Sequence, residues 1–323
     1  MTPAIETLQL TRRYGRMVAL DQLDLTVAQG SIYGFIGPNG AGKTTTLRLL
    51  AGLLEPSSGE IRLLGQRLVP GNAQRLVGYM PDFFGVYDDL RVWEYLDFFA
   101  RCYGLETARR KRTVDELLSL VDLSSKRNAF VQSLSRGMQQ RLCLAHALVH
   151  DPSVLLLDEP ASGLDPRARV ELRELLRTLR EMGKTVLLSS HILSELAEVC
   201  TEIGIIESGK MLVSGPVETV RRQLQGGARL RLRVLRDIET AEATLRRLVD
   251  APTEGLPHLR GVRRDPSDER ALVVEFTEAD EAAQSALLVY LVGQGLALSE
   301  FRAQAENLEE LFLRLTAGDA ESR

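Results

Sequence analysis

A glycine-rich octet is the first feature of the sequence with clear chemical meaning: Gly37, Pro38, Asn39, Gly40, Ala41, Gly42, Lys43 and Thr44, which fit the pattern GxxxxGK[ST]. An apolar run ending at Ile36 precedes it, and a helical pattern begins at Lys43. Glycines in this position let consecutive backbone N–H groups face a phosphate, and the helix N-terminus adds a favourable dipole. Lys43 then reaches the β- and γ-phosphates, the Thr44 hydroxyl ligates Mg²⁺, and Thr45 joins the nucleotide-binding residues. The octet predicts a nucleoside triphosphate site but leaves several enzyme classes open.

Two carboxylates, Asp158 and Glu159, follow a continuous apolar run at residues 154–157. Such a run is typical of a parallel strand that is buried on both faces. A carboxylate at the end of a strand near the phosphate loop holds Mg²⁺, which predicts that role for Asp158. Glu159 is then placed to orient or deprotonate an attacking water, so the pair favours hydrolysis. An acidic pair that merely caps a turn is the alternative, and the upstream loop disfavours it.

A second candidate anion-binding helix end lies at residues 134–138, shortly before the acidic strand. Ser135 is predicted to cap a helix with Gly137 in its first turn, which leaves N–H groups for an anion. Two phosphate-binding helix ends in one chain suggest that the second serves a nucleotide on another copy. An ordinary capped helix is the alternative for this segment taken alone.

Together these segments resemble the nucleotide-binding subunits of ABC transporters, over about the first 220 residues. Six features are similar to the family's motifs and stand in the family's order: Tyr14 as the adenine-stacking aromatic, residues 37–44 as Walker A, residues 134–138 as the LSGGQ signature, residues 154–159 as Walker B, residues 162–165 as the D-loop, and His191 as the switch histidine. For Tyr14 a packed strand-end aromatic stays open as the alternative.

The resemblance implies a P-loop ATPase that uses ATP and Mg²⁺ and pairs head to tail, as a homodimer or with a paired ABC ATPase subunit. Each ATP would lie between Walker A of one copy and the signature of the other. Glu159 would be the general base, His191 would contact the γ-phosphate, and Asp165 would communicate across the dimer. The implied partner is a separate transmembrane permease, with no nucleic acid. The implied location is peripheral, on the cytoplasmic face of the inner membrane, and the implied transport is outward.

Three residues depart from the family pattern. Arg136 replaces a signature glycine, Met138 replaces the signature glutamine, and Asp82 stands after Pro81 where the Q-loop glutamine is expected. The acid at position 82 is able to engage Mg²⁺ or water, and we expect Ser135 and Gly137 to keep the phosphate contact. The variants resemble those of ABC-2 type exporters, whose permease is a separate chain.

Bulk composition narrows the function further. The 323-residue chain is 44% hydrophobic and 26% charged, as is ordinary for a globular protein. Its net charge is only -4, so the overall charge does not indicate binding to nucleic acid or to an anionic membrane. Its three cysteines lie far apart with no CxxC pair, which excludes a disulfide framework and a zinc site and fits a reducing compartment. No secretory signal is evident, and the longest apolar stretch is too short to span a bilayer, so a membrane role requires another chain.

The periodicity divides the chain into two domains. Residues 1–222 predict a mainly parallel α/β sheet of the P-loop NTPase class, with a helical subdomain at about residues 81–150. Residues 223–323 predict a small α+β domain of split βαβ type with an accessory or regulatory role. Its predicted elements are strands at 230–234, 272–276 and 296–301, helices at 241–249, 282–292 and 308–315, and a loop rich in Pro, Gly and Asp after the first helix.

Two rival functions remain. A soluble ABC-type ATPase that acts on a non-transport partner is disfavoured by the single P-loop and the lack of a heptad insertion. A non-hydrolysing ATP clamp is disfavoured by the intact set of Lys43, Asp158, Glu159 and His191. The helical insertion also carries a cluster of aromatics that forms either core or a groove for the permease: Phe83, Phe84, Tyr87, Trp93, Tyr95, Phe98 and Phe99.

Overall fold

The computed structural model describes residues 2–69, 71–82, 85, 89–192, 198–224, 229–253, 255–276 and 281–304. The chain divides into two compact units, Met1–Val220 and Arg221–Arg323, two residues before the predicted division. The predicted helix at 308–315 and the aromatics Phe83, Phe84 and Tyr87 lie outside the described residues. No helix in the described ranges is long and apolar enough to cross a bilayer.

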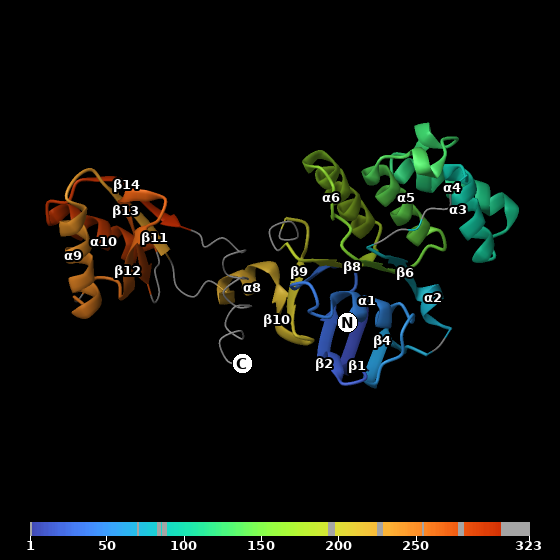
Figure 1. Cartoon of the computed structure of the whole chain (residues 1–323), viewed down its shortest axis with the longest axis horizontal. Helices are drawn as coiled ribbons and strands as arrows, with labels where there is room; N and C mark the ends of the chain where they lie inside the picture. The colour runs from blue at the N-terminus through green and yellow to red at the C-terminus, as the bar shows by residue number, and fades with distance from the viewer. Residues whose placement is uncertain are drawn as a thin grey trace. The chain divides into compact units, whose positions relative to one another are not determined.

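Two sheets form the framework of the first unit (Figure 1). The smaller sheet has the strand order β2-β1-β4-β5, from β1 (Ile5–Tyr14), β2 (Met17–Val27), β4 (Ser58–Leu63) and β5 (Gln66–Arg67). The larger sheet has the order β10-β9-β3-β8-β7-β6, from β3 (Ile32–Ile36), β6 (Val77–Met80), β7 (Val154–Leu157), β8 (Thr185–Ser190), β9 (Glu202–Glu207) and β10 (Lys210–Pro216). Strands β9, β3, β8, β7 and β6 pair in parallel, and every residue of β3, β7 and β8 is buried, as their apolar runs predict.

The helices that the structure describes in this unit are α1 (Lys43–Leu50), α2 (Ala73–Leu76), α3 (Val92–Cys102), α4 (Thr107–Leu120), α5 (Arg136–Leu148) and α6 (Pro166–Glu181), with 3₁₀ turns η1 (Ser124–Lys126) and η2 (Val131–Ser133). Helix α8 (Val217–Leu224) spans the division between the two units. Helix α1 lies between the two sheets in Figure 1. Its Leu47 and Leu50 are fully buried in one core with Leu23 of β2, Leu156 of β7 and Leu187 of β8. Burial on both sides fixes the axis of α1, and therefore the direction in which its N-terminus points.

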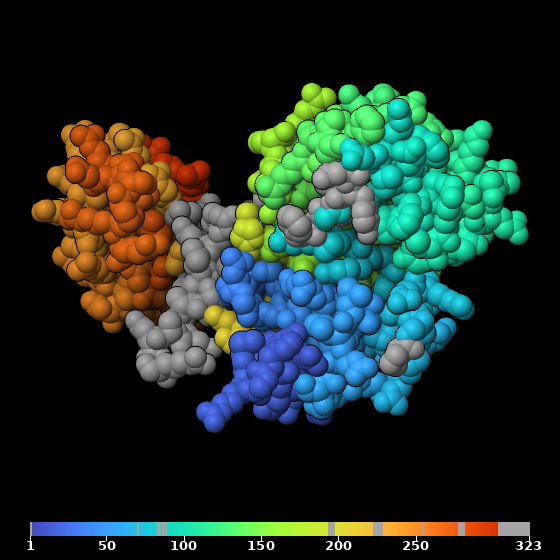
Figure 2. Space-filling view, turned by 45° about the vertical axis from the view of Figure 1, so that its right-hand side comes forward, coloured from blue at the N-terminus to red at the C-terminus, as the bar shows by residue number. Residues whose placement is uncertain are grey.

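Helices α3, α4 and α5 lie within the predicted insertion at residues 81–150, and in Figure 2 this segment (cyan to green) and the N-terminal strands (blue) cover different parts of the unit's surface. Helix α5 packs directly on β6 because Gly78 has no side chain: a Cβ there would collide with the Ala147 carbonyl oxygen. A ring nitrogen of His150 lies 3.0 Å from the Val77 carbonyl oxygen. The C-terminal end of α5 is thus fixed to the strand that leads to Asp82.

Part of the aromatic cluster belongs to the core of the helical segment. Tyr95 is 1% exposed and its ring lies 4.9 Å from that of Phe99, which lies 3.8 Å from the ring of His146. Phe98, in contrast, is 46% exposed. The core interpretation therefore holds for Tyr95, while Phe98 lies nearer the surface with its ring against that of Phe99.

In its described residues from 229 onward, the second unit has a four-stranded antiparallel sheet and two helices. Its elements are β11 (Arg229–Val234), α9 (Ile238–Asp250), β12 (Leu259–Asp265), β13 (Asp268–Phe276), α10 (Glu281–Gly293) and β14 (Leu298–Gln304), with the strand order β12-β13-β11-β14. Each helix connects two strands that flank a third, which is the split βαβ arrangement. The prediction that only a loop follows α9 is wrong, because strand β12 forms there. Four of its seven residues are charged and only Leu259 is buried, as edge strands often show, so apolar alternation did not reveal it.

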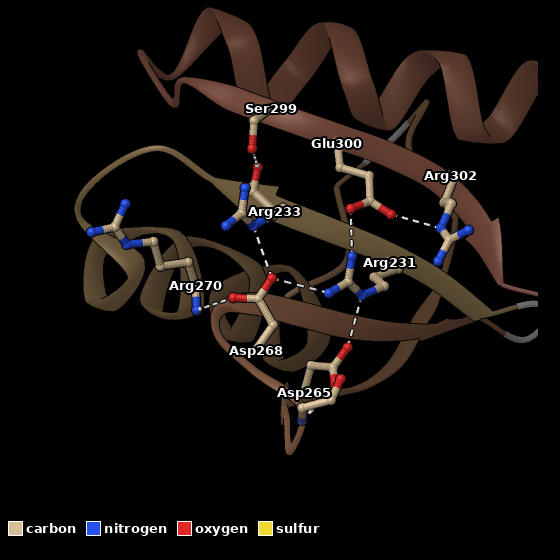
Figure 3. A network of polar contacts seen from close by, with 9 residues as sticks. Arg231, Arg233, Asp265, Asp268, Arg270, Ser299, Glu300 and Arg302 are labelled. Carbon is tan, nitrogen blue, oxygen red and sulfur yellow. Dashed lines mark hydrogen bonds and ion pairs between the residues drawn. The ribbon is translucent and has the colours of Figure 1, made fainter.

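The two faces of this sheet differ in chemistry. Leu230 and Leu232 of β11 are buried against helix residues that include Leu245 and Leu287. The alternate residues carry charge: Arg231 donates to Asp265 at 2.7 Å, to Asp268 at 3.1 Å and to Glu300 (Figure 3). The hydrogen bond from Arg231 is the main reason that the pKa of Asp265 lies well below its usual range. Mutual pairing neutralises this face, so it offers no uniform field to a charged partner.

Acid sensitivity is expected from two partly buried histidines, His146 of α5 and His150 just after it. Burial lowers the pKa of His146 from 6.5 to about 4 and also lowers the pKa of His150. The unfolded chain therefore binds protons near pH 6.5 that the fold resists, and stability is lost as the pH falls from 6.5 toward 4. The loss in the free energy of unfolding should reach about 1.4 kcal/mol per pH unit for one such group.

His146→Phe, which keeps a ring against Phe99, should make the free energy of unfolding less dependent on pH, as measured by urea unfolding at pH 7, 6 and 5. His258→Gln, at an exposed position, is the matched control. Equal slopes for His146→Phe and the wild type would contradict the assignment.

Candidate functional site

The glycine-rich loop joins β3 to α1 through a turn that depends on missing side chains. Gly40 and Gly42 have φ of +84° and +109°, a region that glycine adopts readily. A Cβ on Gly42 would collide with Leu20 and the Ala19 carbonyl oxygen of β2, while a Cβ on Gly40 would meet nothing within 4 Å. Gly37 has the same constraint, because a Cβ there would collide with the Ile206 carbonyl oxygen of β9. The loop is therefore pressed between β2 and β9, with its tip at Asn39 and Gly40 exposed.

No side chain caps the N-terminus of α1. The first N–H groups of a helix lack partners within the helix, so at α1 they stay available to an anion together with the positive end of the helix dipole. Thr44 and Thr45 of this first turn are partly exposed, and Pro38 and Ala41 shape the turn through a 3.2 Å bond from the Ala41 N–H to the Pro38 carbonyl oxygen. This arrangement fits the predicted phosphate cradle.

The three predicted catalytic residues, Lys43, Glu159 and His191, lie in one row. Lys43 is 6% exposed and donates to the Gly37 carbonyl oxygen at 2.7 Å and to the Pro38 carbonyl oxygen at 3.3 Å. Its Nζ also lies 3.3 Å from Glu159 Oε1, and His191 Nδ1 lies 2.9 Å from Glu159 Oε2. A buried ammonium and a carboxylate thus share an enclosed space, in which each offsets the other's desolvation.

Asp158 offers a free oxygen in a buried position. Its side chain is 1% exposed; Oδ1 accepts a 2.7 Å hydrogen bond from Ser189, and Oδ2 has no partner among the residues that the structure describes. Burial raises the pKa of Asp158, and the charges of Asp82 and Glu159 add to the rise. The hydroxyls of Ser189 and Thr44 oppose it, although only the Ser189 contact has full hydrogen-bond geometry. An unpaired buried carboxylate oxygen beside a hydroxyl suits a hard cation.

Within the described ranges no three His, Cys, Asp or Glu side chains converge to hold a metal by themselves. Asp82 is exposed just after β6, near enough for its charge to act on Asp158. A cation at Asp158 would therefore need oxygens from Thr44 and from a bound ligand. Such a site takes up its metal together with a phosphate compound.

The residues predicted from the second helix start form a separate group. The Ser135 hydroxyl accepts a 3.4 Å bond from the Met138 N–H, and Asp165 caps α6 through a 2.8 Å bond from the Ala168 N–H. Gln140 of α5 donates to the Ser162 carbonyl oxygen at 3.2 Å, which ties the two helix starts together. Ser135, Gly137 and Asp165 line one hollow of about 290 Å³.

Arg136, the departure from the signature pattern, lies over the D-loop. A Cβ built on Gly163, whose φ is +68°, would collide with the Arg136 guanidinium. In the described part of the chain, no side-chain hydrogen bond or ion pair joins Ser135 or Asp165 to the row of Lys43, Glu159 and His191. One molecule therefore presents two separate groups of binding residues.

Tyr14 ends β1 with its side chain 40% exposed, and the Arg12 guanidinium lies 4.6 Å from the centre of its ring. The adjoining strand β2 carries Ala19 and Leu20, which pack against Gly42. Tyr14 is thus not a core aromatic, and the Arg12 guanidinium lies over one face of its ring. Its adenine-stacking role remains a prediction.

Ser189 is a site residue that the sequence analysis missed. It is fully buried, accepts the Glu159 N–H at 3.0 Å and donates to Asp158. The available signal was a pair of serines, Ser189 and Ser190, at the end of an apolar strand just before His191. Without the pairing of β8 with β7, that signal does not point to the acidic pair.

Comparisons with known proteins agree with this geometry. A family model described as ABC transporter matches residues 20–162. The Nod factor export ATP-binding protein I of Ralstonia nicotianae is 34% identical, over 98% of this chain and 94% of that protein. The bacitracin transport ATP-binding protein BcrA of Bacillus licheniformis is 40% identical, over 69% of this chain and 73% of that protein.

Solved structures show the same similarity. The structure of an ATP binding subunit of an ABC transporter is 32% identical with a TM-score of 0.62, covering 68% of this chain and 92% of that one. A dimeric bacterial ABC transporter cassette is 25% identical with a TM-score of 0.60, covering 66% of this chain and 98% of that one. The α/β architecture of the first unit is therefore shared with these cassettes.

The loop geometry gives a test with a matched pair of variants. Gly42→Ala should lower stability by at least about 2 kcal/mol more than Gly40→Ala, because both positions have positive φ but only position 42 lacks room for a methyl group. Gly42→Ala should also lose binding of a fluorescent ATP analogue, since Lys43 and the start of α1 would shift. Thermal unfolding and analogue titration measure both effects. Equal behaviour of the two variants would show that the packing around Gly42 does not shape the loop.

Proposed function

Since the chain belongs to the family of ABC transporter ATP-binding subunits, we propose that it powers export through a separate membrane permease, from the cytoplasmic face of the membrane. It is an ATPase of this family, and the observation that carries the proposal is the row of Lys43, Glu159 and His191 beside the unpaired oxygen of Asp158. Glu159, the carboxylate that would act on water, and Asp158, the carboxylate that would hold a cation, then lie next to one phosphate loop.

The binding roles follow from the described contacts. The loop glycines and the uncapped start of α1 hold the phosphates, and Lys43 exchanges its bonds to Gly37 and Pro38 for phosphate oxygens. Thr44 and Asp158 Oδ2 hold Mg²⁺, with Asp82 as an additional acidic neighbour. Mg²⁺ supplies charge neutralisation at the phosphate oxygens. The fit rests on the orphaned buried oxygen of Asp158.

The hydrolytic roles belong to the other two members of the row. Glu159 takes a proton from the attacking water, once Lys43 has left it for the phosphates. His191 orients the Glu159 carboxylate through Nδ1, which leaves its other ring nitrogen for the γ-phosphate. The bond from His191 holds Oε2, so Oε1 is the oxygen that faces the water.

A second subunit completes the site. The group of Ser135, Gly137 and Asp165 is separate from the Lys43 row within one molecule, so we assign it to the nucleotide of a paired subunit in a head-to-tail dimer. Tyr14 stacks on adenine, and nucleic acid is not a partner. The relatives named above serve Nod factor export and bacitracin transport; for this chain the proposal extends to outward transport, with the substrate selected by the permease. The second unit has an accessory or regulatory role.

Glu159→Gln tests the hydrolytic assignment. Phosphate release should fall by at least about 100-fold, because an amide cannot accept the proton, while ATP binding should persist. With Mg²⁺ and ATP the variant should self-associate, which light scattering or gel filtration measures. Glu181→Gln, at an exposed position at the end of α6, is the control and should match the wild type. Near-normal turnover of Glu159→Gln would remove Glu159 as the general base.

Asp82→Ala tests the additional acidic neighbour. At fixed ATP, the Mg²⁺ concentration that gives half-maximal turnover should rise several-fold, because one carboxylate near Asp158 is lost, whereas Asp82→Glu should stay close to the wild type. Asp89→Ala, in the same connecting segment and held by Gln132, serves as the control. An unchanged Mg²⁺ dependence in Asp82→Ala would exclude Asp82 from the cation site.

A further inference from the structure

One fully buried hydroxyl, that of Ser189, connects the Asp158 carboxylate to the backbone N–H of Glu159. Leu157 of β7 is paired with Leu188 of β8, so the next residues, Asp158 and Ser189, lie level with each other across the parallel strands. Ser189 Oγ accepts the Glu159 N–H at 3.0 Å and donates to Asp158 Oδ1 at 2.7 Å. Ser189 is 0% exposed, so no water competes for these bonds.

The bond to Glu159 supports an unfavourable backbone conformation. The Asp158 N–H continues the ladder to the Met80 carbonyl oxygen at 2.8 Å, and the chain then leaves the sheet. Glu159 has φ of +49°, a left-handed conformation that costs a residue with a side chain about 1 kcal/mol or more. Its N–H finds an acceptor in the Ser189 hydroxyl rather than in the strand ladder. This bond therefore stabilises the turn that directs the Glu159 carboxylate toward Lys43 and His191.

The bond to Asp158 decides which of its oxygens is free. Ser189 occupies Oδ1, and Oδ2 is left buried without a partner in the described part of the chain. Because the same hydroxyl accepts from Glu159, its own hydrogen is directed to Asp158, which fixes the plane of that carboxylate. The neighbouring Ser190 differs: among the residues that the structure describes, its hydroxyl bonds within the turn, to Ile192.

We propose that Ser189 is a positioning residue of the hydrolytic site. Its hydroxyl aims Asp158 Oδ2 at the cation and holds Glu159 in the conformation that faces the water, while touching neither cation nor water itself. The inference rests on the roles proposed above for Asp158 and Glu159, and it adds a residue on which both depend. It predicts that losing one hydroxyl impairs the chemical step and the use of Mg²⁺ together.

The test compares Ser189→Ala, Ser189→Cys and Ser31→Ala in the full chain. Cysteine fills the position but is a poor hydrogen-bonding group. Ser31 is a buried serine at the start of β3 whose hydroxyl bonds the Ala28 carbonyl oxygen, so its loss reports on removing a buried hydroxyl elsewhere on the same sheet. Both Ser189 variants should show kcat lowered by about tenfold or more, half-saturating Mg²⁺ raised several-fold, and KM for ATP within about twofold of the wild type. Ser31→Ala should keep all three values.

Several results would overturn the inference. The inference fails if Ser189→Ala has the kcat and Mg²⁺ dependence of the wild type. It also fails if Ser189→Cys has wild-type activity, because position 189 would then contribute only packing. An equal loss in Ser31→Ala would also overturn the inference, because it would indicate general destabilisation. Thermal unfolding of each variant separates loss of folding from loss of catalysis, and Ser189→Cys serves if the alanine variant does not fold.

Glu159→Gln in the same assay separates the positioning role of Ser189 from the proposed hydrolytic mechanism. If that variant is inactive and Ser189→Ala is normal, only the positioning role fails; if that variant is active, the proposed hydrolytic mechanism fails.

Discussion

Parallel pairing of β3, β8 and β7 is the constraint on which the whole site depends. Parallel strands end at the same edge of a sheet, so the residues that follow Ile36, Leu188 and Leu157 meet there. The Gly37 N–H donates to the Ser190 carbonyl oxygen at 3.2 Å, and Ser189 bonds both Asp158 and Glu159. Segments more than 100 residues apart in the chain are brought together by this edge alone. The apolar interior of the three strands serves function by holding that edge in register.

Charge compensation is the second principle of the site. Lys43 is nearly buried and lies between two loop carbonyl oxygens and Glu159, so its charge is offset before any phosphate arrives. Asp158 has no such compensation at Oδ2, and burial raises its pKa. A cation would pair with Asp158, and a phosphate would replace Glu159 at Lys43, so the two together would leave every charged group of the site with a partner. This reciprocity explains why the proposed ligand is a nucleotide with its metal rather than either alone.

The second unit follows different physics. Its helices cover one face of an antiparallel sheet, and the other face is closed by ion pairs around Arg231 (Figure 3). Ion pairs shielded from water contribute little net stability, because the cost of desolvation offsets their attraction, so the core around Leu230, Leu272 and Leu287 carries the fold of this unit. Paired charges also fix the register of β11 with β14, because a one-residue slip would place Arg231 on the apolar face.

The sequence alone determined the features that are local in the chain. The glycine positions, the caps at Ser135 and Asp165 and the apolar runs of β7 and β8 each act within a few residues, so spacing was enough to predict the phosphate loop, two helix starts and the buried strands. It failed at β12, whose charged residues lack alternation because the strand lies at a sheet edge. Only the tertiary structure decided which residues meet: Ser189 with the acidic pair, Arg136 with Gly163, and Lys43 with Glu159. These contacts depend on strand order and register, which short-range patterns do not specify, because the partners are held together by packing between segments far apart in the chain.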